Sequence, residues 1–259
     1  MKDIREILSV TDHTCLSVTA TQEDIDLLCR QAAKYRTASV CVPPSYVSYA
    51  AECLARAGER LPVCTVIGFP NGYSLPKVKA FEAEKAIESG ADELDMVINI
   101  GEVKNGRFDR VLSEINLIKS VCNGRILKVI IETCLLTEEE KLRLCGVVSF
   151  SAADYIKTST GFAGGGAAVS DVLLLKANLK NGTKLKAAGG ISTFEFASEL
   201  LEAGADRLGS SRLAALAEKA DPAYGGFWWT RYLTASKTFS LQRDWIYWAR
   251  SSCSSWGCG

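Results

Sequence analysis

The chain of 259 residues carries 30 Lys and Arg against 30 Asp and Glu, so no net charge attracts nucleic acid or an anionic membrane surface. Its charged start lacks the apolar core of a signal peptide, and no uncharged apolar run approaches the roughly 18 residues of a membrane span. We therefore expect a cytosolic protein that acts on a small molecule, with no nucleic-acid or membrane partner.

Apolar, β-rich runs alternate along the chain with stretches of helical spacing. The runs start roughly 20 to 35 residues apart, the length of one strand plus one helix. Eight such units predict an α/β fold, a single (β/α)8 TIM barrel over residues 1–222, with an open doubly wound sheet as the alternative. The expected strands are Asp12–Leu16, Ala38–Val42, Val63–Phe69, Glu93–Ile100, Ile126–Glu132, Ala153–Lys157, Thr183–Ala188 and Asp206–Gly209, and the expected helices are Glu23–Tyr35, Tyr46–Ala57, Pro76–Ser89, Phe108–Val121, Glu138–Val147, Val169–Leu179 and Thr193–Ala203.

Several helix ends carry their own signals. Thr21 has the spacing of a capping box, and Thr137 precedes three glutamates suited to the helix dipole. Gly90 and Gly204 each follow a helix and are each succeeded by Ala-Asp and a strand. We interpret the pair as one helix-to-strand turn used twice.

Residues 223–259 break the pattern of strands and helices. All five tryptophans lie in this stretch, so we expect an atypical aromatic-rich tail. One interpretation is a flap or an oligomer contact. The favoured one is an accretion without a selected fold, such as a shifted reading frame would leave.

Ten cysteines and one histidine narrow the possible chemistry. Eight cysteines lie irregularly spaced between Cys15 and Cys145, which is typical of small core residues in a reducing compartment. His13 is the only histidine, so the chain has no histidine pair for zinc and no spare base for a Ser-His-Asp triad. The count therefore argues against a zinc site, and we expect no catalytic role for His13.

Three charged residues fall at or near the ends of expected strands. They are Asp95, Lys157 and Lys186. Charges inside apolar strands are costly to bury unless they meet one another, and strands four, six and seven of a barrel can reach one mouth. Lys184 shares the strand face of Lys186, which we prefer because it lies nearer the loop.

Two neighbouring lysines point to amine chemistry. A free lysine has a pKa of about 10.4, and a nearby ammonium together with partial burial can lower it by several units. The resulting amine forms an iminium with an aldehyde or ketone and acidifies the adjacent carbon. Asp95 would move the protons, alone or through water held by Asp12 or Thr14. This pattern predicts class I aldolase chemistry.

Glycines at three strand exits indicate a phosphate site. Gly189 and Gly190 end the seventh expected strand, Gly209–Ser211 ends the eighth, and Gly161 follows Lys157. Barrels commonly hold phosphate on the loops after strands seven and eight. One Gly-Gly pair by itself marks a turn, but glycines at adjacent exits favour a phosphate-binding role.

Seven segments in order along the chain carry a family resemblance: Asp12–Thr14, Val40–Pro43, Val66–Pro70, Glu93–Gly101, Lys128–Thr133, Ile156–Phe162 and Lys184–Ile191. With these motifs, residues 1 to 220 resemble the deoxyribose-phosphate aldolases. The resemblance implies a barrel that reversibly cleaves 2-deoxy-D-ribose 5-phosphate to acetaldehyde and D-glyceraldehyde 3-phosphate, without cofactor or metal.

The resemblance also implies roles for individual residues. Lys157 matches the Schiff-base lysine, Lys186 the second lysine that tunes it, and Asp95 the proton-transferring acid. The residues expected to bind the substrate or its phosphate are Asp12, Thr14, Thr158, Gly161, Gly189, Gly190, Ser210 and Ser211.

The chain departs from the family pattern in two places. Family members usually read Ala-Ser-Gly-Gly where this chain has Ala187–Gly190, which removes one hydroxyl, and the tail has no family counterpart. Cys41 matches a cysteine common in the family and is interpreted as core filler rather than as a reactive thiol.

The partners that we expect are a small phosphosugar, an aldehyde and a second copy of the chain in a dimer. Two other functions stay open from the sequence. One is another Schiff-base barrel enzyme, either a different phosphosugar aldolase or a transaldolase. The other is a non-catalytic barrel that binds sugar phosphates.

Overall fold

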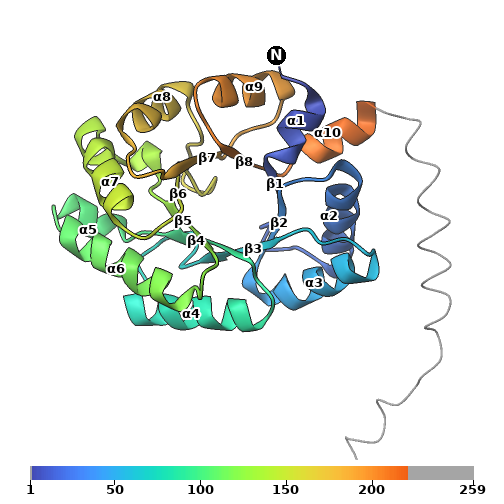
Figure 1. Ribbon diagram of the computed structural model, residues 1–259, viewed down its shortest axis with the longest axis horizontal. Helices are drawn as coiled ribbons and strands as arrows, with labels where there is room; N and C mark the ends of the chain where they lie inside the picture. The colour runs from blue at the N-terminus through green and yellow to red at the C-terminus, as the bar shows by residue number, and fades with distance from the viewer. Residues whose placement is uncertain (1, 221–259) are drawn as a thin grey trace, which may run out of the picture. The chain divides into compact units, whose positions relative to one another are not determined.

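The computed structural model describes residues 2–220 of the chain. Within this range the strands are parallel, pair in chain order and close where β1 meets β8. Figure 1 shows them as a central ring with helices around it. The predicted (β/α)8 barrel is confirmed, and the open doubly wound sheet is wrong. The strands are β1 (Thr11–Thr14), β2 (Ser39–Val42), β3 (Val63–Ile67), β4 (Glu93–Val97), β5 (Ile126–Ile130), β6 (Tyr155–Lys157), β7 (Lys184–Ala188) and β8 (Arg207–Ser210).

The helices follow the expected order, with short additions between them. The expected fourth strand is too long, because the chain turns at Asn99 and begins a short helix at Ile100. The helices are α1 (Ile4–Ser9), α2 (Gln22–Tyr35), η1 (Pro44–Tyr46), α3 (Val47–Arg56), α4 (Pro76–Glu88), α5 (Ile100–Lys104), α6 (Phe108–Val121), η2 (Thr133–Leu135), α7 (Glu138–Phe150), α8 (Val169–Asn178), α9 (Phe194–Glu202) and α10 (Leu213–Ala220).

Two helices begin with capping boxes, of which the one at Thr21 was predicted from the sequence. At the start of α2, Thr21 and Asp24 each bond the backbone N–H of the other. At the start of α7, Thr137 and Glu140 do the same. Each box satisfies two backbone donors that a helix start would otherwise leave unpaired.

The predicted repeated turn is also present. Gly90 after α4 and Gly204 after α9 have φ values of 106° and 111°, which only glycine adopts at low cost. In both turns the aspartate two residues later accepts a hydrogen bond from the strand that precedes the helix. These bonds run from Val63 N to Asp92 Oδ2 at 2.9 Å and from Leu185 N to Asp206 Oδ2 at 2.8 Å.

The apolar core has two layers. The larger one lies between the sheet and the helices and includes Leu94, Leu127, Ile156 and Leu185, all fully buried. A smaller cluster inside the barrel consists of Cys41, Cys64 and Val66, with Leu16 and Phe69 packed against it. The rest of the barrel interior is therefore available to polar side chains.

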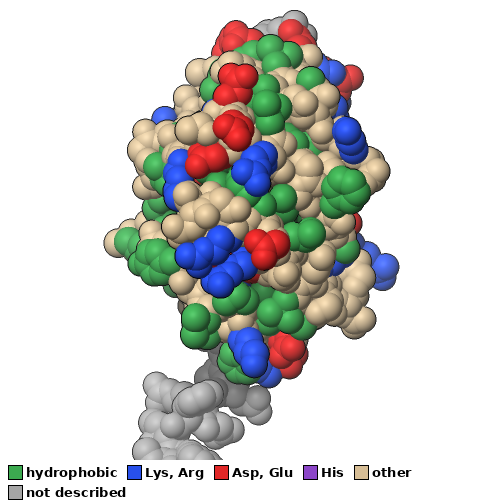
Figure 2. Space-filling model, turned by 90° about the vertical axis from the view of Figure 1, so that its left-hand side faces the viewer, with side chains coloured by type: hydrophobic (Ala, Val, Ile, Leu, Met, Phe, Trp, Pro, Cys, Tyr) green, Lys and Arg blue, Asp and Glu red, His purple; other side chains and the backbone are tan. Residues whose placement is uncertain are grey.

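The described surface carries charges of both signs. On the face around α5 and α7, Figure 2 shows acidic and basic side chains interspersed among apolar and neutral ones. No helix among the described residues is long and apolar enough to cross a lipid bilayer. The predicted boundary at residue 222 and the predicted tail, residues 223–259, lie outside the described residues.

Candidate active site

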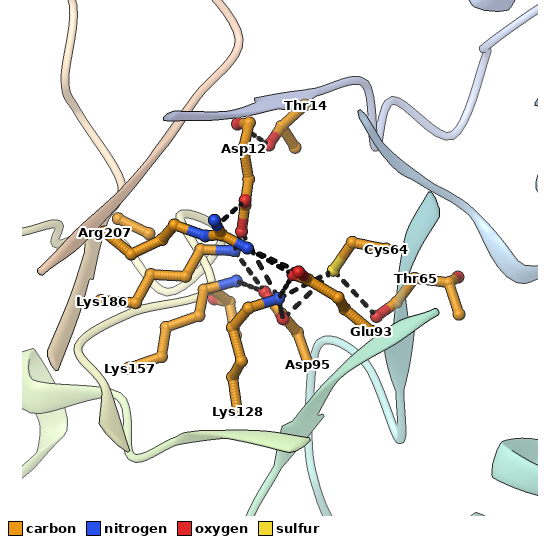
Figure 3. A network of polar contacts seen from close by, with 12 residues as sticks. Asp12, Thr14, Cys64, Thr65, Glu93, Asp95, Lys128, Lys157, Lys186 and Arg207 are labelled. Carbon is orange, nitrogen blue, oxygen red and sulfur yellow. Dashed lines mark hydrogen bonds and ion pairs between the residues drawn. The ribbon is translucent and has the colours of Figure 1, made fainter. Parts of the chain in front are cut away.

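Charged side chains from six strands meet inside the barrel, and Figure 3 shows them pointing toward one another. Alternate residues of each strand face the interior, where an unpaired charge would be costly. We call this set the interior charge cluster. Among the described residues it consists of Asp12 on β1, Glu93 and Asp95 on β4, Lys128 on β5, Lys157 on β6, Lys186 on β7 and Arg207 on β8.

Asp95 is the centre of the interior charge cluster. Lys157 Nζ and Lys186 Nζ both donate to its Oδ2, at 2.8 and 2.6 Å, and Lys128 Nζ donates to its Oδ1 at 2.8 Å. Lys157 and Lys186 are also direct partners in the register of β6 and β7. The structure thus brings the three charged residues singled out in the sequence into direct contact.

Two further carboxylates compensate the remaining cations. Asp12 accepts a hydrogen bond from Lys186 Nζ and lies 2.9 Å from Arg207 Nε. Glu93 contacts Lys128 Nζ at 2.7 Å and accepts hydrogen bonds from Arg207 at 2.6 and 2.8 Å. The cluster is therefore a continuous network that links β1, β4, β5, β6, β7 and β8.

The network keeps both buried aspartates ionised. Burial would raise the pKa of Asp95, but the three neighbouring lysines outweigh it and hold the pKa well below its usual value. Burial likewise opposes ionisation of Asp12, and Lys128, Lys186 and Arg207 together lower its pKa. Opposite charges at contact distance thus dominate over desolvation.

The same interactions keep three basic groups charged. Burial lowers the pKa of Lys128 and of Lys186, but Asp12 and Asp95 outweigh it, so both pKa values lie above the usual one. The pKa of Arg207 is also raised, because its carboxylate partners outweigh the burial that opposes them. These groups act as fixed positive charges.

Lys157 stands apart from the other members. Without it, the cluster of described residues holds three carboxylates and three cations, joined by the contacts given above. Lys157 Nζ contacts Asp95 Oδ2 at 2.8 Å and shares this carboxylate with Lys128 and Lys186. Lys157 is therefore an additional amine beside the three cations and three carboxylates of the cluster.

A cavity of about 550 Å³ opens over this lysine. Lys157 is the one member of the interior charge cluster among the described residues that line it. His13 also lines the cavity, where its Nε2 lies 2.9 Å from Gln31 Oε1. The residues expected at the substrate or its phosphate that line the same cavity are Thr14, Gly161, Gly189, Gly190, Ser210 and Ser211.

Two other residues expected at the substrate take different places. Asp12 is fully buried beneath the cavity lining, where it holds Lys186. Thr158 is also buried, and its hydroxyl donates to Ala188 O at 3.2 Å and accepts from Ala188 N at 3.1 Å. Both bind residues of another strand, and neither is among the described residues that line the cavity.

Two glycines make the close approaches that the site requires. A Cβ on Gly209 would lie 3.1 Å from Lys186 Cε, so the missing side chain leaves room for the lysine stem. A Cβ on Gly189 would lie 3.0 Å from Gly166 Cα, and the Gly189 φ of 89° favours glycine as well. Gly189 therefore lets the loops after β6 and β7 pack against each other.

Three members of the interior charge cluster were not predicted as site residues from the sequence. They are Glu93, Lys128 and Arg207. The signal was present for Lys128, which interrupts the apolar run Ile126–Ile130. Charges in apolar strands were expected to meet, and Lys128 does so by facing Asp95 in the register of β4 and β5. The sequence of one strand does not show which residue of the next strand lies beside it, so the contact between Lys128 and Asp95 could not be predicted.

Two groups of donors have the spacing of metal ligands. The ligand atoms of Cys41, Cys64 and Asp95 lie within 4.8 Å of one another, as do those of Asp12, Cys64 and Glu93. In both groups the carboxylates already bind lysine or arginine, whose positive charges oppose a metal cation.

The fold and the site together define a class of protein, the (β/α)8 barrels with buried lysines beside a cavity at the barrel mouth. The chain belongs to the DeoC/LacD family of aldolases, whose sequence profile matches residues 7–216. It is 53% identical over 211 residues to the deoxyribose-phosphate aldolase of Streptococcus pyogenes serotype M4 (strain MGAS10750), an alignment that covers 82% of this chain and 93% of the relative. The chain is thus an aldolase, a carbon-carbon lyase.

Solved structures agree with this family. An aldolase named QR15 superimposes with a TM-score of 0.78 at 34% identity, covering 88% of this chain and 98% of that one. The deoxyribose-phosphate aldolase of Aeropyrum pernix, described as a unique tetramer, gives a TM-score of 0.75 at 31% identity, covering 85% and 93%.

Removal of Lys128 tests the electrostatic role of the network. Lys128→Met leaves buried carboxylates without their shared cation, so we expect the free energy of unfolding to fall by about 3 to 5 kcal/mol in urea titrations. The exposed Lys180 provides the control, because Lys180→Met should change stability by no more than about 0.5 kcal/mol. Equal effects of the two substitutions would contradict the role assigned to Lys128.

The same variant has a signature in pH. The folded-state pKa values of Asp12 and Asp95 are lowered, so their contribution to stability is present above about pH 4 and is lost as the pH falls further. In Lys128→Met these carboxylates bind protons more readily while folded. The difference in stability between wild type and variant should therefore shrink between about pH 7 and about pH 3.

Proposed function

We propose that this aldolase reversibly cleaves 2-deoxy-D-ribose 5-phosphate to acetaldehyde and D-glyceraldehyde 3-phosphate, with Lys157 as the Schiff-base residue. The observation that carries the assignment is the position of Lys157. Lys157 contacts Asp95 in the interior charge cluster and also lines the cavity. The Streptococcus pyogenes relative, at 53% identity, supports the choice of substrate.

The reaction then proceeds in four balanced steps. The Lys157 amine adds to the C1 aldehyde of the open-chain sugar, and loss of water gives an iminium. A base removes the proton of the C3 hydroxyl, the C2–C3 bond breaks, and its electron pair forms an enamine on C1 and C2. D-glyceraldehyde 3-phosphate leaves, C2 of the enamine takes up a proton, and water releases acetaldehyde and the free amine.

Asp95 and Lys186 are the residues that we assign to proton transfer. Asp95 is a carboxylate that accepts from Lys157 Nζ, and Lys186 is an ammonium bound to the same oxygen. The pair offers one acceptor and one donor beside the reacting nitrogen. Lys186 has a second effect, because its fixed charge disfavours a second ammonium at Lys157.

The phosphate group is assigned to the loops after β6, β7 and β8. Gly161, Gly190 and Ser211 all line the cavity with Lys157. Ser210 holds this region together, since its Oγ donates to Ile191 O at 2.7 Å and accepts from Arg212 N at 3.1 Å. Backbone amides near a helix start favour an anion at this place.

Borohydride trapping tests the nucleophile. Reduction in the presence of acetaldehyde should leave a two-carbon adduct on Lys157, located by peptide mass mapping. Lys157→Met should abolish the adduct, whereas Lys184→Met, at an exposed lysine, should retain it. An adduct on Lys184 or Lys186 in the wild type, or none at all, would overturn the assignment.

Lys186→Leu tests the tuning of the nucleophile. Asp95 then compensates Lys157 in place of Lys186, so Lys157 keeps its proton at neutral pH. We expect trapping at pH 7 to slow by about tenfold or more and to recover toward about pH 10. Circular dichroism controls for the fold, and unchanged trapping at pH 7 contradicts the tuning role.

We also propose that the protein is a cytoplasmic homodimer. The eight cysteines among the described residues are free, which suits a reducing compartment such as the cytoplasm.

Two observations support an oligomer. The Aeropyrum pernix relative is a tetramer, and the apolar side chains of Tyr73 and Phe81 expose 72% and 58% of their surface. Light scattering should give about twice the chain mass of 28.0 kDa, and a monomer at micromolar concentration would contradict the proposal.

A further inference from the structure

One buried carboxylate at the barrel mouth lies outside the interior charge cluster. Glu132 follows β5, and only 2% of its surface is exposed. Thr160 N donates to its Oε2 and Oε1 at 3.1 and 3.3 Å, and Thr160 Oγ1 donates to its Oε2 as well. The charge of Glu132 is therefore directed at the loop between β6 and α8, three residues after Lys157.

The backbone of Glu132 is held in an unusual conformation. Its φ and ψ are 54° and 68°, in the left-handed region that non-glycine residues rarely adopt. The flanking residues fix it there, because Ile131 N donates to Lys157 O at 3.0 Å and Thr133 N donates to Thr158 O at 2.9 Å. Such outliers concentrate at functional sites, where the surrounding structure imposes them.

The contacts of Glu132 continue into the cavity wall. Thr160 lines the cavity, and its Oγ1 accepts from Phe162 N at 3.0 Å. The Phe162 ring meets the Phe69 ring edge to face, with centroids 5.2 Å apart. Gly161, assigned above to the phosphate, lies between the two residues that this chain of contacts fixes.

We propose that Glu132 is a positioning residue for the phosphorylated end of the substrate. By holding Thr160 it fixes Gly161 and Phe162 at the cavity mouth, and it takes no part in bond making at Lys157. This inference rests on the proposed function. It implies that Glu132 governs KM for the phosphosugar and leaves the reaction of Lys157 with a small aldehyde unaffected.

Glu132→Gln tests this separation. The substitution removes the negative charge and replaces one of the two accepting oxygens by an NH2 group, which cannot accept from Thr160, while the size of the side chain is kept. We expect KM for 2-deoxyribose 5-phosphate to rise about tenfold, as for the loss of one hydrogen bond to a charged group, with kcat within about twofold. Acetaldehyde, which has no phosphate, should be trapped on Lys157 at the wild-type rate. Glu139→Gln, at an exposed position on α7, is the matched control and should leave KM unchanged.

The outcomes that contradict the inference are distinct. An unchanged KM in Glu132→Gln overturns it, and so does a parallel loss of kcat, trapping and Tm, which would show a structural role alone. If that variant does not fold, Thr160→Val removes the same hydroxyl from the other side and should raise KM similarly. Failure of trapping in the wild type would instead refute the proposed function. In that case the stabilisation of Tm by inorganic phosphate still tests Glu132, and it should be weaker in Glu132→Gln than in the wild type.

Discussion

The carboxylate of Asp95 binding three lysines is the interaction on which the site depends. Its two oxygens lie within 2.8 Å of Lys128, Lys157 and Lys186. Ions at such distances inside a protein interact strongly enough to offset part of their desolvation, provided that each is paired. Asp95 thereby gathers the lysines into one small volume where two of them stay charged. The third, Lys157, lines the cavity.

The site is divided between a charged interior and a glycine-rich mouth. The interior fixes charge, and the mouth supplies backbone amides around a cavity. Gly209 belongs to both parts, since it leaves space for the stem of Lys186 and lies at the exit of β8. Thr158 connects the parts by pairing β6 with β7 through its hydroxyl. Shape and electrostatics are therefore set by different residues on the same strands.

Much of this arrangement could be predicted from the sequence. The number and order of strands followed from the alternating patterns, and Lys157, Lys186 and Asp95 stood out as charges within apolar runs. Lys128 escaped, because its importance comes from its register with Asp95. Asp12 was expected at the substrate, but the closure of β1 against β8 places it under Lys186 and beside Arg207. Pairing between distant segments was the missing information in both cases.

Ala188, the residue near the site that departs from the family pattern, lies on the cavity wall. This position, where the family usually has serine, is 5% exposed. A Cβ placed on Gly209 would lie 3.0 Å from the Ala188 Cβ. The alanine methyl therefore lies close to the exit of β8, and a hydroxyl at this point would add one polar group to the wall.

Closure of the barrel between β1 and β8 also brings together two charged residues from the two ends of the barrel sequence. Asp12 enters with the first strand and Arg207 with the last, and they become ion-pair partners only when the sheet is complete. A sheet that stayed open between β1 and β8 would leave Arg207 without its contact with Asp12. The charge network around Asp12 is therefore complete only in the closed barrel.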